Sequence, residues 1–198
     1  MRFIISIWRY IQYNFFGPII QYFQGKFFHN RTEYYLNNKN SIIGPAIEWA
    51  NGSKTWYLNG ERHREDGPAI EFVNGDKQWY LNGNLHRVDG PAIDCINGDK
   101  YWYLNGKVHR EDGPAVERVD GSKEWWLNSK LHRENGPAVE CANGNKEWFL
   151  NGNLHRIDGP AYECVNGRKE YWINGERVTK KAQEVLYVMY KLKGIKNA

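Results

Sequence analysis

Long hydrophobic runs are missing from this sequence. No stretch approaches the roughly 20 consecutive apolar residues that a membrane-spanning helix needs. The mean hydropathy of -0.76 also argues against a thick aliphatic core. The opening MRFIISIW has too short an apolar run before Arg9, and no small-residue cleavage site, for a secretory signal. We therefore expect an intracellular protein.

Cysteine is scarce, with three residues in the whole chain. Cys95, Cys141 and Cys164 occupy one equivalent position in a repeating pattern, and other copies fill that position with Trp, Phe or Arg. An odd count without a secretory signal favours a reducing compartment. Equivalent positions two strands apart would be separated by about 9.6 Å, beyond the roughly 7 Å limit for a disulfide. The cysteines are therefore predicted to be packing residues.

Acidic residues are absent from the first 31 positions, which carry four Lys or Arg and a net charge of +4. Residues 176–198 carry six Lys or Arg against two Glu, again +4. The remaining residues carry 17 Lys or Arg against 21 Asp or Glu, a net charge of -4. The ends are basic and the middle is mildly acidic, so we do not expect the middle to bind nucleic acid.

Aromatic residues and repetition are abundant instead. Nine Trp, 13 Tyr and 8 Phe suit side chains that are half buried on a sheet surface. The segment GPAIDCINGDKYWYLNGKVHRED, from Gly90 to Asp112, recurs with a period of 23 residues. Copies begin at the Gly-Pro pairs of Gly44, Gly67, Gly90, Gly113, Gly136 and Gly159. This period is typical of a repeat protein that grows along one axis.

Every regular copy but one contains two Asn-Gly pairs, and the copy that starts at Gly113 has Asp120-Gly121 and Asn128-Ser129 at these positions. The first, such as Asn143-Gly144, lies between two strand-like runs and predicts a hairpin with a two-residue type I′ turn. The second, such as Asn151-Gly152, is interpreted as part of a wide connecting loop, because identical repeats favour an even number of antiparallel strands. Each repeat is thus expected to contribute one hairpin.

The two-residue turn determines which side chains share a face of the sheet. One face would hold Val139, Cys141, Lys146, Trp148 and Leu150, and it is the expected packing surface. The other face would hold Ala138, Glu140, Ala142, Glu147 and Phe149. This register also opposes Glu140 to Glu147, which is unfavourable. Either a loop arginine such as Arg133 or Arg156 lies between them, or the register is wrong.

We therefore predict an all-β repeat protein, an elongated twisted antiparallel sheet of stacked β-hairpins. The array spans residues 17–178, with a degenerate first copy over 17–43 and regular copies from Gly44. From Thr179, a candidate N-cap, the pattern becomes helical, and residues 179–198 are expected to form a C-terminal capping helix and tail. Its shared apolar face holds Ala182, Val185, Leu186 and Met189.

Residues 1–16 form an amphipathic segment. Its apolar helical face holds Ile4, Ile7, Trp8, Ile11 and Phe15. We expect this segment to cap the first hairpin. One alternative is an interfacial membrane anchor, and another is a strand with alternating apolar residues.

The segment Asn105-Gly106-Lys107-Val108-His109, followed by Asp112-Gly113 and then by Asp120-Gly121, resembles the MORN repeat family. The resemblance covers roughly Gly17 to Gly175. It implies a hairpin per 23-residue repeat, an elongated antiparallel sheet, and a role in scaffolding and protein interaction, with lipid binding sometimes proposed. The repeat departs from the MORN pattern by placing Arg directly after His, as at Arg110, and by replacing the aromatic-Gly-x-Trp element with Trp102-Tyr103-Leu104.

Related variant repeats occur in large DNA viruses, bacteriophages and bacterial antitoxin-like proteins. That similarity implies a viral or phage structural or host-interaction protein, either cytoplasmic or virion-associated. A second resemblance, to the aromatic hairpin repeats of cell-wall-binding proteins, rests on Lys54 to Asn59, but those repeats are shorter and belong to exported proteins.

Histidine recurs once per copy, at His63, His86, His109, His132 and His155. Because neighbouring copies would be about 9.6 Å apart, no pair could share a metal ion. We interpret these histidines as structural residues of the connecting loop. No metal site or cofactor is predicted.

Lysine and tryptophan form a second recurring pair. The pairs are Lys54 with Trp56, Lys77 with Trp79, Lys100 with Trp102, Lys123 with Trp125, and Lys146 with Trp148. Such a ladder suits a partner protein, a glycan or single-stranded nucleic acid. The alternative is that the rings only hold successive hairpins together.

Catalysis is disfavoured, because an active site needs one asymmetric constellation and the carboxylates here recur without a nucleophile or a phosphate loop. The leading hypothesis is a non-enzymatic scaffold that binds protein or associates with itself, with no small-molecule substrate. Two alternatives stay open: a membrane-surface adaptor anchored by residues 1–16, and polymer binding along the Trp/Lys ladder.

Overall fold

A computed structural model describes residues 23–28, 31–36 and 44–192. The chain divides into two compact units. The first comprises residues up to Gly75 together with Trp79–Gly83, and the second comprises Asp76–Gln78 together with residues from Asn84 onward. Strand pairing is described below within each unit.

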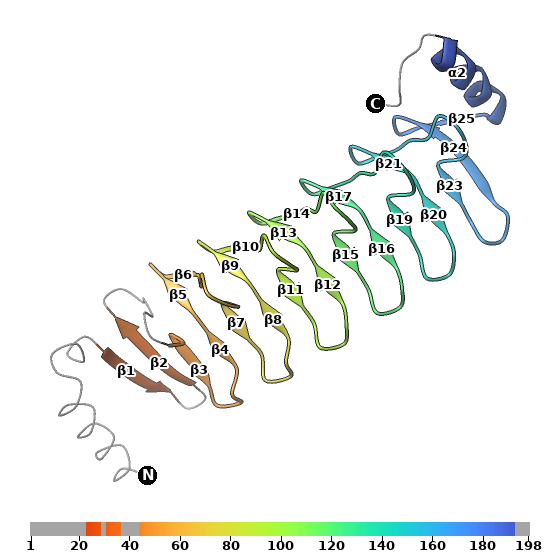
Figure 1. The fold of residues 1–198 in the computed structure, drawn as a ribbon. Coiled ribbons are helices and arrows are strands. Elements are labelled where there is room, and N and C mark those ends of the chain that lie inside the picture. The colour runs from red at the N-terminus through yellow and green to blue at the C-terminus, as the bar shows by residue number, and fades with distance from the viewer. Residues whose placement is uncertain (1–22, 29–30, 37–43, 193–198) are drawn as a thin grey trace. The chain divides into compact units, whose positions relative to one another are not determined.

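Every regular copy contributes two short strands to a main antiparallel sheet (Figure 1). These strands are β3 (Ile47–Trp49), β4 (Lys54–Thr55), β7 (Ile70–Glu71), β8 (Lys77–Gln78), β11 (Ile93–Asp94), β12 (Lys100–Tyr101), β15 (Val116–Glu117), β16 (Lys123–Glu124), β19 (Val139–Glu140), β20 (Lys146–Glu147), β23 (Tyr162–Glu163) and β24 (Lys169–Ile173). In the second unit the order is β8-β11-β12-β15-β16-β19-β20-β23-β24-β25, and in the first it is β1-β2-β3-β4-β7. The predicted all-β repeat of stacked hairpins is confirmed.

Each copy also forms a second, smaller hairpin, so the prediction of a wide connecting loop was wrong. In the first unit β5 (Tyr57–Leu58) pairs with β6 (Glu61–Arg62). In the second unit the pairs are β13 (Tyr103–Leu104) with β14 (Lys107–Val108), β17 (Trp126–Leu127) with β18 (Lys130–Leu131), and β21 (Phe149–Leu150) with β22 (Asn153–Leu154). Two hairpins also give an even number of strands, so the parity argument did not exclude this arrangement.

The type I′ turn belongs to this second hairpin. Phe149 pairs with Leu154 and Leu150 with Asn153, which leaves a two-residue loop. Asn151 and Gly152, the loop residues, have φ of 53° and 88°. Both positive values are what a type I′ turn requires.

The first hairpin has a three-residue loop instead. Gly144 N–H donates to Cys141 O at 2.9 Å, and Cys141 N–H donates to Asn145 O at 2.9 Å. Gly144 has a φ of 90°, the pattern of a type I turn closed by a glycine bulge. Asn143 Oδ1 accepts a 3.0 Å hydrogen bond from Asn145 N–H, which stabilises the longer loop.

This longer loop shifts the pairing by one residue, so the predicted register was wrong. Glu140 faces Lys146, and Val139 faces Glu147. Because a one-residue shift exchanges the faces of one strand relative to its neighbour, Val139 and Cys141 share a face with Glu147, not with Lys146. The predicted opposition of Glu140 and Glu147 does not occur.

The first unit begins with a longer hairpin. β1 (Phe23–Phe28) pairs with β2 (Arg31–Leu36) along its whole length. β2 then pairs with β3, where Glu33 faces Ile47. Ile4, Ile7, Trp8, Ile11 and Phe15 lie outside the described residues, so the interpretation of residues 1–16 stays a prediction.

The second unit ends with β25 (Glu176–Val178) and α2 (Lys180–Leu192). Thr179 caps the helix, because its Oγ1 accepts a 3.2 Å hydrogen bond from Ala182 N–H. The helix contacts β24, and Gln183 is its buried residue. Gln183 also donates through Nε2 to Ile157 O.

The helix packs through a different face from the aliphatic one. Val185, Leu186 and Met189 are 52%, 41% and 48% exposed, while Tyr187 and Tyr190 are half buried on the side of Gln183. The predicted C-terminal helix is therefore present, but its aliphatic face points away from the sheet. The sequence pattern alone did not reveal this orientation.

Candidate interaction surface

The arginine that follows each histidine organises one face of the sheet. Arg110 stacks on Trp102, with its Cζ 4.1 Å from the ring centroid. Its Nη1 donates to Pro114 O at 3.2 Å and to Glu117 Oε1 at 3.0 Å. Arg64, Arg133 and Arg156 stack in the same way on Trp56, Trp125 and Trp148. The arginine thus connects the tryptophan of one copy to the first strand of the next.

The glycine of each Gly-Pro pair makes room for this arginine. A Cβ on Gly113 would lie 2.9 Å from Arg110 Cζ, closer than ordinary side-chain contacts. Arg110 Nε also donates to Asp112 Oδ1 at 2.8 Å, and this hydrogen bond lowers the pKa of Asp112. Arg64 lowers the pKa of Asp66 by the same contact. The sequence identified this arginine as a departure from the MORN pattern and as a possible partner of the glutamates, but it gave no sign of the stack on tryptophan.

The predicted tryptophan ladder lies on this face, between buried alanines. Trp125 N–H donates to Ala138 O at 2.8 Å, and Trp148 N–H donates to Ala161 O at 2.8 Å. The alanine of each Gly-Pro-Ala is at most 1% exposed. When the observed strand pairing is extended by one residue, Ala138 faces Trp125 on one neighbouring strand and Trp148 on the other. Alanine side chains thus make up most of the buried hydrophobic residues that are described, and the indole rings beside them are half buried.

The predicted lysines lie in the same face and alternate with acids across the strands. Lys100 faces Asp94 on one side and Glu117 on the other. Lys123 and Lys146 are each flanked by two glutamates on the neighbouring strands. Lys54 lies between Glu48 and Glu71. Lys77 faces Asp94. Opposite charges on adjacent strands attract each other. We call this arginine-, lysine- and tryptophan-bearing side the charged face.

Each histidine contacts the type I′ turn of the next copy. His132 Nδ1 accepts a 3.2 Å hydrogen bond from Asn151 N–H and lies 3.0 Å from Asn151 Oδ1. The backbone donors to His63, His86, His109 and His155 are Asn82, Asn105, Asn128 and Asn174. These contacts join successive small hairpins. Within the described part of the chain, no group of three or more His, Cys, Asp or Glu side chains is placed to hold a metal ion.

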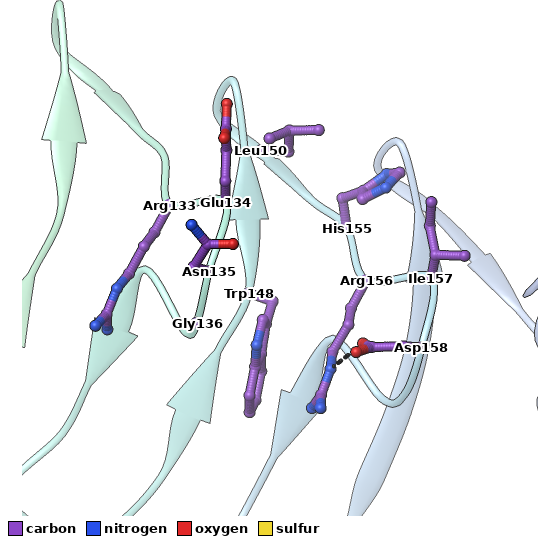
Figure 2. A pocket seen from close by; sticks show the side chains of 10 residues that line it. All are labelled: Arg133, Glu134, Asn135, Gly136, Trp148, Leu150, His155, Arg156, Ile157 and Asp158. Carbon is purple, nitrogen blue, oxygen red and sulfur yellow. Dashed lines mark hydrogen bonds and ion pairs between the residues drawn. The ribbon is translucent and has the colours of Figure 1, made fainter. Parts of the chain in front are cut away.

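A cavity of about 360 Å³ opens between two consecutive loops of the second unit (Figure 2). Trp148 lies between the loop that starts at Arg133 and the loop that contains Arg156. Arg156 pairs with Asp158 at 2.8 Å, whereas Asn135 occupies the position that Asp158 fills in its own copy. The lining combines charged and aromatic groups and, among the described residues, brings no nucleophile beside a base.

The opposite face carries a row of aliphatic and aromatic residues. In the second unit the cross-strand order is Gln78, Ile93, Tyr101, Val116, Glu124, Val139, Glu147, Tyr162 and Glu170. Side-chain alternation adds Tyr103, Trp126, Phe149 and Trp172 to the same face. The 2.8 Å hydrogen bond from Trp126 Nε1 to Glu124 Oε2 agrees with this placement. We call this side the aromatic face.

The aromatic face is only half buried. Val116 is 5% exposed, but Tyr103, Trp126 and Phe149 are all intermediate. In the first unit, the equivalent face of β3 and β7 leaves Trp49 38% and Phe72 39% exposed. The described helix contacts β24. A surface of this kind is typical of interaction sites.

Sequence reasoning did not single out the aromatic residues that follow the tryptophan ladder. They are Tyr57, Tyr80, Tyr103, Trp126, Phe149 and Trp172. A signal was present, because this position is aromatic in every regular copy. The incorrect register obscured it by grouping Phe149 with Ala138 and Glu140. The described helix is too short and polar to cross a membrane.

Comparison of the sequence with protein-family models and with curated proteins finds no match. The resemblance of the repeat to the MORN family therefore stays a proposal.

Proposed function

We propose that this chain is a non-enzymatic, MORN-like repeat scaffold that binds a partner protein through the aromatic face. The observation that carries the proposal is the contrast between the two faces. The arginines of the charged face stack on its tryptophans and pair with its glutamates, whereas the aromatic face leaves rings half exposed in successive copies. Burial of aromatic and aliphatic area is the main source of binding free energy at protein interfaces.

The charged face offers less to a ligand. The tryptophan rings of four copies are covered by guanidinium groups at 3.7 to 4.1 Å. A base or sugar ring would have to displace these groups before stacking on that side of the indole. The lysines of the main sheet are also flanked by carboxylates, which weakens their attraction for phosphate. This geometry favours protein binding over polymer binding along the Trp/Lys ladder.

Site-specific photo-crosslinking tests which face binds. A photoreactive phenylalanine analogue would replace Phe149 on the aromatic face or, as the matched control, Lys146 on the charged face. Circular dichroism would establish that both proteins keep their strand content. Each would then be irradiated in an extract of the native host.

We expect discrete crosslinked protein products from position 149 and none from position 146. Products from both positions in equal amount would indicate non-specific adhesion. Products from position 146 alone would move the binding site to the charged face. Either result would end the assignment to the aromatic face.

A further inference from the structure

Three glutamates occupy the same repeat position on the aromatic face, namely Glu124, Glu147 and Glu170. Glu124 forms a 2.6 Å ion pair with Arg118 Nη1 and accepts a 2.8 Å hydrogen bond from Trp126 Nε1. Glu170 has the same two kinds of partner, because it pairs with Arg168 Nη2 and accepts a 3.1 Å hydrogen bond from Trp172 Nε1. Two of the three carboxylates are therefore satisfied within the chain.

Glu147 has neither donor. Phe149, which has no side-chain N–H, stands where Trp126 and Trp172 supply a ring nitrogen. Cys141 stands where Arg118 supplies its guanidinium, and Asn145 stands where Arg168 does. The Asn145 side chain instead accepts a 3.0 Å hydrogen bond from Val165 N–H through Oδ1. Among the described residues, no side chain donates to the carboxylate of Glu147.

The surroundings of Glu147 make this carboxylate unusual. Its cross-strand neighbours are Val139 on one side and Tyr162 on the other. Burial raises the pKa of Glu147, and the charge of Glu124 adds to the effect. Partial burial of a charged carboxylate costs free energy because the group loses contact with water. Glu124 and Glu170 offset this cost by pairing with an arginine, whereas Glu147 has no such cation.

We infer that Glu147 is the point at which the partner protein inserts a basic side chain. This inference rests on the proposed function and specifies the chemistry of the partner. The partner presents an arginine or lysine between apolar groups, which cover Phe149, Val139 and Tyr162 while the cation pairs with the carboxylate. An arginine matches the site well, because guanidinium already fills the same role beside Glu124.

The test selects peptides without knowledge of the natural partner. A phage-displayed library of random peptides, each about 12 residues long, would be panned in parallel on the full chain, on Glu147→Gln and on Phe149→Ser. A fourth bait, Cys141→Arg, supplies the internal guanidinium that Arg118 supplies to Glu124. Peptides selected on the unmodified chain would be synthesised with arginine or with citrulline, which keeps the shape and loses the charge.

We expect arginine or lysine at one fixed position, beside aromatic or aliphatic residues, in peptides selected on the unmodified chain. That preference should disappear with Glu147→Gln and with Cys141→Arg. Citrulline should weaken binding about tenfold or more, because a desolvated charge would lose its partner.

Equal frequencies of basic residues on the unmodified and Glu147→Gln baits would overturn the inference, as would equal binding of the citrulline peptide. If such peptides still require Phe149, the aromatic face binds protein and only the role of Glu147 is wrong. If no selected peptide depends on Phe149, the proposed function and this inference both fail.

Discussion

Replacing Gly113 with alanine tests the arginine contact that joins successive copies. The added Cβ at this position would lie 2.9 Å from Arg110 Cζ, so the guanidinium would have to move away from Trp102. The backbone of Gly113 is outside the positive-φ region, so alanine is otherwise tolerated. Gly44 is the matched control, because it opens a copy in the same way and a Cβ there meets no described residue within 4 Å.

The interactions of Arg110 limit the cost of this substitution, because the arginine can swing aside. Its stack on Trp102 contributes about 0.5–1 kcal/mol at an exposed site. Its hydrogen bond to Pro114 O and its ion pair with the half-exposed Glu117 together add about 1 kcal/mol. Alanine recovers about 0.4–1 kcal/mol by restricting the unfolded chain. Gly113→Ala should therefore destabilise by about 1 kcal/mol, whereas Gly44→Ala should stabilise by about 0.5 kcal/mol.

A double-mutant cycle with Arg110→Ala isolates the contact. Urea unfolding followed by circular dichroism measures the global stability. Stability varies along a repeat array, so a local measurement is also needed. Amide hydrogen exchange at Trp102 and Ala115 measures the stability of the region around the contact. Once Arg110 is truncated, Gly113→Ala should become neutral or stabilising. The reasoning is refuted if Gly113→Ala costs the same in both backgrounds, or if it behaves like Gly44→Ala.

Three further substitutions test the turns, the core and the unpaired carboxylate. Ser129 has a φ of 62° where other copies have glycine. Ser129→Gly should therefore raise the free energy of unfolding by about 0.5–1 kcal/mol. Ser122→Gly is the control, and it should not raise the free energy of unfolding. Ala138 is fully buried, so Ala138→Leu should cost about 1–3 kcal/mol in urea unfolding, whereas the exposed Ala142→Leu should not. The pKa of Glu147 is raised in the folded chain, so stability should fall as pH rises from the ordinary glutamate pKa through the folded value. Glu147→Gln should therefore raise the melting temperature at neutral pH, and the two proteins should melt at more similar temperatures in acid. An equal shift in melting temperature at both pH values would contradict the raised pKa of Glu147.

The two Asn-Gly pairs found in every regular copy but the one at Gly113 show why local signals identified hairpins but not their registers. Asn-Gly fits both a type I′ turn and a type I turn closed by a glycine bulge, and the two differ by one residue of pairing. Asn151-Gly152 adopts the first and Asn143-Gly144 takes part in the second. The conflict between Glu140 and Glu147 indicated the error from sequence, and of the two remedies offered it is the register error that the structure shows, because the two glutamates do not face each other. The register is shifted, and Arg133 also pairs with Glu140 at 2.9 Å.

The C-terminal helix shows a second limit of pattern reasoning. Its boundaries and its N-cap at Thr179 followed from local residue preferences. Its orientation did not, because the aliphatic stripe of Val185 and Met189 would ordinarily be assigned to the buried side. Gln183, Tyr187 and Tyr190 occupy the sheet-facing side instead.

The 23-residue period by itself determined the repeat architecture, the two strands that each copy adds to the main sheet, and the equivalence of positions between copies. Those properties depend on spacing and turn residues, which are local. The tertiary structure alone decided which side chains share a face, that Arg110 spans two copies, and that Glu147 lacks the donors of Glu124 and Glu170. Such contacts depend on pairing between strands, where a shift of one residue exchanges the two faces.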